Sequence, residues 1–354
     1  MVEKFGSKEN NKFDKNLNFR FAKVSDINKI QNFYKAHWPY KNIITEDLIF
    51  LLYEFADGLD LNFLICECKN TNSIESIIGF YSYSKHSKHK HICGSMSLVN
   101  PLSKYPLLGI ETLKRLKLMT KCFSYCGTNT NPKTMMPLVK RFLSHHTDKM
   151  NHYYLINDRL DSFDICNPDK NFINKKKKRK ITLKMDLIND MEDLIKTKII
   201  FNEFQNIPFK SLEYIIKKYI LHPIYKYNIY KINESKNTLG IIVTRIVTIS
   251  NISVLRVIDF IGQLKVLPFI DINLLNMIYK NKYEYVDILT NLPEEFFEAS
   301  LFIDKSKTKS IIPNYFEPFE KKNIEIYYES SLKDLYFFKG DADGDRPNFR
   351  RVKY

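Results

Sequence analysis

The two halves of this chain predict the same order of secondary structure, and this repeat constrains the fold more than any other feature of the sequence. In the N-terminal half, alternating apolar residues predict strands, and apolar residues at helical spacing predict helices. The order is strand, two helices, three strands, helix, strand, helix and strand, at residues 19–24, 27–38, 46–56, 61–68, 77–84, 92–98, 110–121, 122–127, 135–144 and 153–157.

The C-terminal half repeats this order with little residue identity. Its elements are predicted at residues 181–185, 189–196, 210–220, 227–232, 239–249, 253–260, 269–279, 283–289, 293–302, 324–330 and 335–338. The segment 293–302 is expected to be a helix, because a proline stands at its first turn. A repeated order without repeated residues indicates an old duplication and two similar domains.

We therefore predict an α/β chain, with a mixed α+β sheet covered by helices in each of two tandem domains. A chain of 354 residues is long enough for two domains of ordinary size. Periodicity is lost from about residue 158 to 180, so we place the domains at 18–174 and 181–354. The basic run 175–180 predicts a solvated linker or hairpin tip, and a phosphate-binding or nuclear-localisation-like patch is the alternative.

Charge and cysteine usage limit the partners and the compartment. The net charge of +15 suits an anionic partner without specifying one, and the richness in Lys, Asn and Ile explains it equally well as compositional drift. Nucleic acid is therefore not the expected partner, although tRNA stays open. The polar residues 1–18 do not resemble a signal peptide, no run of about 18 uncharged apolar residues occurs, and the six cysteines are too sparse for a secreted disulfide scaffold. We expect a cytoplasmic protein.

Four segments of the C-terminal half carry a family resemblance: His222–Tyr227 (HPIYKY), Val254–Gly262 (VLRVIDFIG), Tyr283–Asp287 (YEYVD) and Lys339–Asn348 (KGDADGDRPN). Together with the element order, they resemble tandem GNAT-like acyltransferases encoded with bacterial capsule, O-antigen or other surface-polysaccharide genes. The resemblance implies two GNAT-like domains (acyl-CoA N-acyltransferase-like), with the active site in the C-terminal one. It also implies transfer of an acyl group from acetyl-CoA or another acyl-CoA to an amine or hydroxyl of a sugar or sugar nucleotide.

The sequence departs from the family where coenzyme A should bind. GNAT enzymes hold the pyrophosphate with a glycine-rich loop between the fourth strand and the next helix, where backbone N–H groups point at the phosphates. Neither equivalent segment, 95–109 or 262–268, contains a glycine cluster. Two alternatives therefore stay open: a Fem-like ligase that uses aminoacyl-tRNA, and a non-catalytic carbohydrate-binding or scaffold protein on the same fold.

The strand at 253–260 has a carboxylate near its end, Asp259, in an otherwise apolar setting. From strand alternation we expect one face to carry Leu255, Val257 and Asp259, and the other Arg256, Ile258 and Phe260. In the GNAT arrangement this strand parts from the next one, and the acyl group lies in the gap. Asp259 is the expected general base, and a structural pairing with Arg245 or Arg256 is the alternative. Asp287, on the next strand, is a second candidate.

The segment 222–227 supplies the other catalytic candidates. His222 is predicted as a proton shuttle or substrate ligand, and a helix C-terminal cap is the alternative. Tyr225 is the expected proton donor to a leaving thiolate, and Tyr225 and Tyr227 are expected to stack on a sugar ring.

The remaining expected contacts are with substrate and lie on three segments. We expect the substrate site to be lined by Tyr227, Arg256, Gln263, Tyr285, Asp343, Asp345 and Arg346. The acidic turn from Asp341 to Asp345 is not an EF-hand, because Val352 stands where the twelfth-position glutamate is required. No metal is predicted; zinc at His86, His89, His91 and Cys93 is the weaker alternative to an exposed hairpin.

Overall fold

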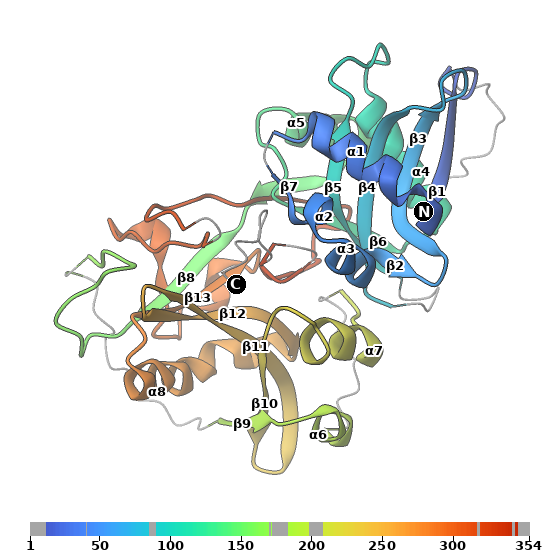
Figure 1. The fold of residues 1–354 in the computed structure, drawn as a ribbon. Coiled ribbons are helices and arrows are strands. Elements are labelled where there is room, and N and C mark those ends of the chain that lie inside the picture. The colour runs from blue at the N-terminus through green and yellow to red at the C-terminus, as the bar shows by residue number, and fades with distance from the viewer. Residues whose placement is uncertain are drawn as a thin grey trace. The chain divides into compact units, whose positions relative to one another are not determined.

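The computed structural model describes residues 12–39, 41–84, 90–169, 171, 183–197, 208–316, 319–341 and 344–345. The chain divides into two compact units (Figure 1). The first contains Met1–Tyr81, Gly94–Cys122 and Asn348–Tyr354, and the second contains Ser82–Cys93 and Phe123–Pro347. The domain limits 18–174 and 181–354 stay a prediction. The basic run 175–180 lies outside the described residues.

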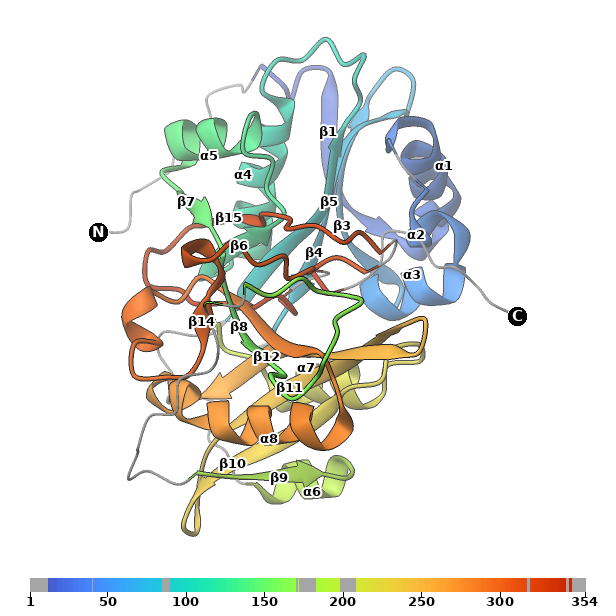
Figure 2. The same cartoon turned by 90° about the vertical axis from the view of Figure 1, so that its left-hand side faces the viewer.

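The first unit is built on antiparallel strands in the order β1-β3-β4-β5, with β2 beside β3. The strands are β1 (Leu17–Lys23), β2 (Ala56–Asp57), β3 (Asp60–Cys68), β4 (Ile74–Ser82) and β5 (His91–Val99). The helices are α1 (Ile27–His37), α2 (Ile43–Glu46), α3 (Leu48–Phe55) and α4 (Leu108–Thr120). Figure 2 shows α1, α2 and α3 on one face of these strands and α4 on the other.

The second unit contains a seven-stranded mixed sheet in the order β14-β8-β13-β12-β11-β10-β9. Its strands are β8 (Asn151–Ile156), β9 (Lys184–Ile188), β10 (Asn228–Glu234), β11 (Asn237–Ile249), β12 (Ile252–Gly262), β13 (Tyr285–Thr290) and β14 (Ile303–Asp304). Only β12 and β13 run parallel, and the crossover between them contains a 3₁₀ helix (Leu264–Ile270) and helix α8 (Asp271–Asn281). A strand, a crossover helix and a parallel strand are the arrangement that the repeat predicts.

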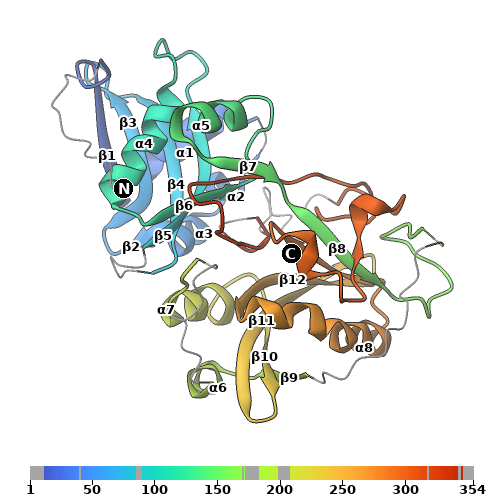
Figure 3. The ribbon, with the colours of Figure 1, turned by 180° about the vertical axis from the view of Figure 1, so that it is seen from behind.

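In the second unit, strands from the first half of the chain pair with strands from the second half. Strand β8, from the first half of the chain, pairs with β13 and with β14, both from the second half. Conversely, β15 (Tyr327–Ser330) pairs with β6 (Ser124–Thr128) and β7 (His146–Lys149). Figure 1 shows β8 alongside β13, and Figure 3 shows β8 from behind. Helices α5 (Met135–Leu143), α6 (Met191–Lys196) and α7 (Leu212–Ile215), the last followed by a π-helical turn at Ile216–Ile220, complete this unit.

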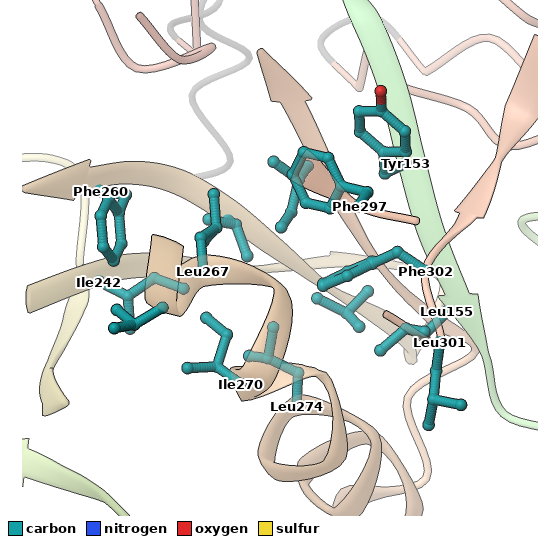
Figure 4. Packing of buried hydrophobic residues seen from close by; sticks show 14 of the residues in the cluster. Tyr153, Leu155, Ile242, Phe260, Leu267, Ile270, Leu274, Phe297, Leu301 and Phe302 are labelled. Carbon is teal, nitrogen blue, oxygen red and sulfur yellow. The ribbon is translucent and has the colours of Figure 1, made fainter. Parts of the chain in front are cut away.

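One face of the seven-stranded sheet packs against α8 and forms the larger core. Leu274 and Ile278, one turn apart on α8, are fully buried against β10 to β13 because they lie on one side of the helix. Figure 4 shows this packing continuing through Phe297 and Phe302 to Leu155 of β8. The opposite face near β10 and β11 is covered by α7 and the π-helical turn.

Two predicted elements are wrong. Only a 3₁₀ turn, Glu294–Phe296, forms where a helix is expected at 293–302. The buried carboxylate of Asp271 accepts the Leu301 N–H at 2.6 Å and so holds this segment in a loop that inserts its apolar side chains into the core. The segment 335–338, expected as a strand, makes a single bridge between Phe338 and Thr290.

Candidate functional site

A β-bulge in β12 reverses the expected orientation of its last residues. Val243 of β11 pairs with Asp259 while the next residue, Thr244, pairs with Val257, which leaves Ile258 as the extra residue. Before the bulge, Leu255 and Val257 face the α8 core; after it, Phe260 does so, while Ile258 and Ile261 face the opposite core. The predicted faces were therefore wrong: Asp259 does not share a face with Leu255 and Val257, because alternation fails at a bulge.

Strands β12 and β13 part at the same place. They pair only at Leu255–Val286, Arg256–Asp287 and Val257–Ile288, although both strands continue further. Such a parting is what the family resemblance implies. The gap is crossed by the chain itself: the Lys339 N–H donates to Leu289 O of β13 at 3.0 Å, and the Gly340 N–H donates to Ile258 O of β12 at 2.8 Å.

Asp259 lies in a buried cluster of charged groups beside this gap. Lys210 Nζ donates to both carboxylate oxygens of Asp259, at 2.6 and 2.7 Å, and lies 2.7 Å from Asp341 Oδ1. The side chains of all three residues are completely buried. The Tyr219 hydroxyl donates to Asp259 Oδ2 at 2.7 Å. Asp259 is thus paired with a lysine, and neither arginine named in the sequence alternative takes that place.

One ammonium between two carboxylates leaves this cluster short of positive charge. Burial raises the pKa of Asp259 above its usual range, and the neighbouring Asp341 adds to this rise while Lys210 opposes it. Burial lowers the pKa of Lys210, but the two carboxylates more than reverse this, so the lysine stays charged. Asp259 is therefore a stronger base than an ordinary carboxylate.

Asp287 forms a second buried cluster, with Arg256 and His152. Arg256 donates Nε and Nη2 to the two oxygens of Asp287 at 2.9 and 2.7 Å, and His152 Nε2 lies 3.0 Å from Asp287 Oδ2. Burial alone would raise the pKa of Asp287, but Arg256 and His152 hold it well below its usual range. A carboxylate with a lowered pKa is a weak base, so this geometry favours Asp259 over Asp287 as a proton acceptor.

The segment 222–227 has a structural role in this conformation. His222 Nδ1 accepts the N–H groups of Ile224 and Tyr225 at 3.1 and 3.0 Å, which fixes a turn after the π-helical segment. The Tyr225 ring lies under Arg245, with 4.3 Å between the guanidinium carbon and the ring centroid. The Tyr227 hydroxyl donates to Asp345 Oδ2 at 2.6 Å.

The other predicted substrate contacts lie in different places. The Tyr285 hydroxyl donates to Pro313 O at 2.6 Å and is buried. Gln263 follows β12, and its N–H donates to Leu239 O at 2.9 Å. Asp343 and Arg346 lie outside the described residues, as do His86 and His89 of the zinc alternative. Where the chain is described, no three His, Cys, Asp or Glu residues are grouped as a metal ion requires.

The segment after β12 does not fit a coenzyme A pyrophosphate. It forms a 3₁₀ helix that leads directly into α8. Residues 262–268 contain a single glycine, so no glycine cluster stands there to hold phosphate groups. The buried carboxylate of Asp271 stands in the first turn of α8 and accepts the Ile272 N–H at 2.7 Å. A buried carboxylate at the helix N-terminus takes the place that a phosphate would need and repels it.

Sequence reasoning missed most of the charged groups that meet at the gap. Lys210, Lys218 and Lys339 are buried there, yet nothing in the sequence context of Lys210 or Lys218 separates them from the rest of the 55 Lys and Arg residues. The one available signal is the position of Lys339 between the apolar run 335–338 and Gly340, which is unusual for an exposed lysine.

Comparisons with known proteins agree with the fold. No family model and no curated protein matches the chain. Among solved structures, a GCN5-related N-acetyltransferase from Anabaena variabilis is similar, with a TM-score of 0.54 and 8% identity over 89% of this chain and 72% of that one. A probable N-acyltransferase from Enterococcus faecalis has a TM-score of 0.49 and 10% identity over 89% and 72% of the two chains. Saccharomyces cerevisiae N-myristoyltransferase has a TM-score of 0.43 and 8% identity over 89% and 80%.

These findings identify the fold class of this chain. The chain has a mixed α/β fold whose neighbours among solved structures are GCN5-related N-acetyltransferases, and the Anabaena structure has a higher TM-score than the other two. Within the described part of the chain, no helix is both long and apolar enough to cross a membrane.

Proposed function

We propose that this protein is a GNAT-fold acyltransferase that moves an acyl group from a thioester to an amine or hydroxyl. The observation that supports this most is the parting of β12 from β13 at a bulge, with buried ionisable side chains beside it. In this fold the reacting acyl group lies between such parted strands. Fold likeness alone would not support a chemistry, because one fold hosts many activities.

Asp259 is the proposed general base, and Asp287 the second candidate. The acceptor nitrogen or oxygen forms a bond to the acyl carbon, the carbon–sulfur bond breaks, and the acceptor proton passes to Asp259. Its raised pKa suits this step better than the lowered pKa of Asp287. We propose that Tyr225 and His222 act on the leaving group and substrate, after release from the contacts described above.

The proposed acceptor is a sugar or sugar nucleotide of surface-polysaccharide biosynthesis in the bacterial cytoplasm, with Arg256, Tyr227, Tyr285, Gln263 and Asp345 as proposed contacts. The family resemblance of the sequence supports this choice. Arg256 and Lys339 are buried cations near the gap, which favours an acceptor that carries negative charge.

The donor is proposed to be an acyl thioester, and acetyl-CoA or another acyl-CoA is the first one to test. Asp271 and the 3₁₀ helix after β12 do not fit the pyrophosphate of coenzyme A. That mismatch favours a second candidate function, a Fem-like ligase whose donor is aminoacyl-tRNA. The crossing of the gap by Lys339 and Gly340 favours a third, a carbohydrate-binding protein without an acyl donor.

The test combines ligand binding with transfer. The full chain is mixed with acetyl-CoA, a long-chain acyl-CoA, aminoacyl-tRNA or a sugar nucleotide, and thermal unfolding is followed together with product mass. Acyltransferase activity predicts a shift with an acyl-CoA and acylation of the acceptor. A response to aminoacyl-tRNA alone would establish the ligase instead, and a response to the sugar nucleotide alone the binding protein.

A base variant tests the residue assignment. Asp259→Asn should lower kcat by at least about 100-fold, the usual contribution of a general base, while the acceptor still binds. Asp148→Asn, a change at an exposed residue of β7, is the matched control and should leave kcat unchanged. An unchanged kcat in folded Asp259→Asn would remove Asp259 from the mechanism.

A further inference from the structure

Two buried cationic groups converge on a single neutral oxygen beside the parted strands. Arg256 Nη1 donates to the backbone oxygen of Asn314 at 2.9 Å, and Lys339 Nζ donates to the same oxygen. Both side chains are almost completely buried, with 4% exposure for each residue. Burying a cation is costly unless enough acceptors replace its water.

The acceptors at hand do not use all the donors of these groups. A guanidinium has five N–H groups, and the bonds to Asp287 and Asn314 use three of those of Arg256. A lysine ammonium has three, and the described part of the chain provides an acceptor for one. Within the part of the chain that the structure describes, hydrogen-bond capacity is therefore left on both sides of Asn314 O.

A small cavity adjoins these donors. It has a volume of about 30 Å³, and Arg245, Arg256, Lys339 and Asp345 line it. This volume matches about one water-sized group. The carboxylates of Asp345 and of Asp287, which pairs with Arg256, balance Arg245 and Arg256, so a protonated Lys339 leaves one positive charge uncompensated. A cavity of this size and charge suits one small monovalent anion.

We propose that this cavity is an anion site, which holds a chloride ion or one oxygen of a carboxylate between Arg256 and Lys339. The anion accepts the remaining N–H groups of both side chains and neutralises the excess charge. Its place next to the parted strands puts it within the core of the second unit, whether or not the protein transfers acyl groups.

Proton uptake accompanies binding at such a site. Burial lowers the pKa of Lys339 well below its usual range, and Arg256 lowers it further, whereas Asp287 and Asp345 act in the opposite direction. An anion at contact distance favours the ammonium form, so it raises this pKa. Anion affinity should therefore fall as pH rises, in parallel with the loss of the proton from Lys339.

The experiment compares anions by size at constant ionic strength. Thermal unfolding of the full chain is followed while sodium isethionate, whose anion is too large for the cavity, is replaced by chloride or by acetate. The unfolding midpoint should rise with the logarithm of the chloride or acetate concentration. A response to chloride alone identifies an inorganic ion, and a response to acetate points to a carboxylate of a substrate.

Two variants make the result specific. Lys339→Met should abolish the response, and Lys333→Met, at an exposed lysine of the same segment, should retain it. Calorimetry in two buffers with different ionisation heats should show protons taken up with the anion in the wild type. Equal unfolding midpoints in chloride, acetate and isethionate would overturn the proposed anion site. An undiminished response to the anion in folded Lys339→Met would do the same.

Discussion

Arg256 and Asp287 form a buried ion pair in the middle of the short stretch where β12 and β13 pair. The two residues face each other in the register of β12 and β13, and their side chains form a bidentate pair. A pair of this kind adds little net stability, but either charged side chain is costly to bury without the other.

Removing only the cation should therefore be severe. We predict that Arg256→Met lowers the free energy of unfolding by about 3–5 kcal/mol, because it leaves the Asp287 carboxylate buried without its main partner. The double variant Arg256→Met with Asp287→Asn should recover most of this loss. Urea denaturation of the wild type and both variants measures the loss of stability. Equal losses in the single and double variants would contradict the role of the unpaired carboxylate.

Lys339 gives a pH dependence of the same sign as Asp287, whose pKa is also lowered, but in a more alkaline range. Its pKa is lowered in the folded protein, so the unfolded chain binds more protons between that value and the ordinary lysine pKa. The stability of the wild type should therefore increase with pH, from the lowered value up to about pH 10. Lys339→Met should be flatter across this range and more stable than the wild type at its lower end, in a low-anion buffer. Chemical denaturation at several pH values measures these stabilities. Parallel pH profiles for the wild type and Lys339→Met would refute the prediction.

At the scale of the element, Gly340 allows the chain to cross between β12 and β13. A Cβ atom at this position would lie 2.4 Å from Ile258 Cγ2 and 2.7 Å from Ile258 O. The second contact is with backbone that is fixed in a strand, so it cannot move aside cheaply.

We predict that Gly340→Ala lowers stability by about 1–3 kcal/mol, the usual effect of overpacking. Gly109→Ala, inside α4, is the control: the added Cβ would meet only the Val99 side chain, at 3.2 Å, and alanine favours a helix. Chemical denaturation compares the two. A milder effect at Gly340 than at Gly109 would mean that the crossing segment is loosely held.

Elements were predictable where periodicity alone decides them. The sequence indicated most strands and helices within a few residues, and the family resemblance implied the parting of β12 from β13. It could not indicate the bulge at Ile258, because a bulge depends on the partner strand. For the same reason it misplaced Asp259 and missed Lys210, whose partners Asp259 and Asp341 lie 49 and 131 residues away in sequence.

At the scale of the molecule, the exchange of strands bears on how the chain can be divided. Strand β8 lies between β13 and β14, so a fragment that begins at residue 181 lacks an inner strand of its sheet. We predict that the fragment 181–354 does not fold by itself, and that its circular dichroism shows no cooperative thermal transition. A cooperative transition in this fragment would instead support the tandem domain limits expected from the sequence.

The position of β8 also has a consequence for synthesis on the ribosome. This strand is translated early, but its two neighbours are translated more than 120 residues later, at 285–290 and 303–304. Until then its backbone N–H and C=O groups have no partners in the sheet, and an unpaired strand edge is prone to association with other chains. Such a nascent chain would benefit from slow local folding or from a chaperone that covers residues 151–156 until their partners emerge.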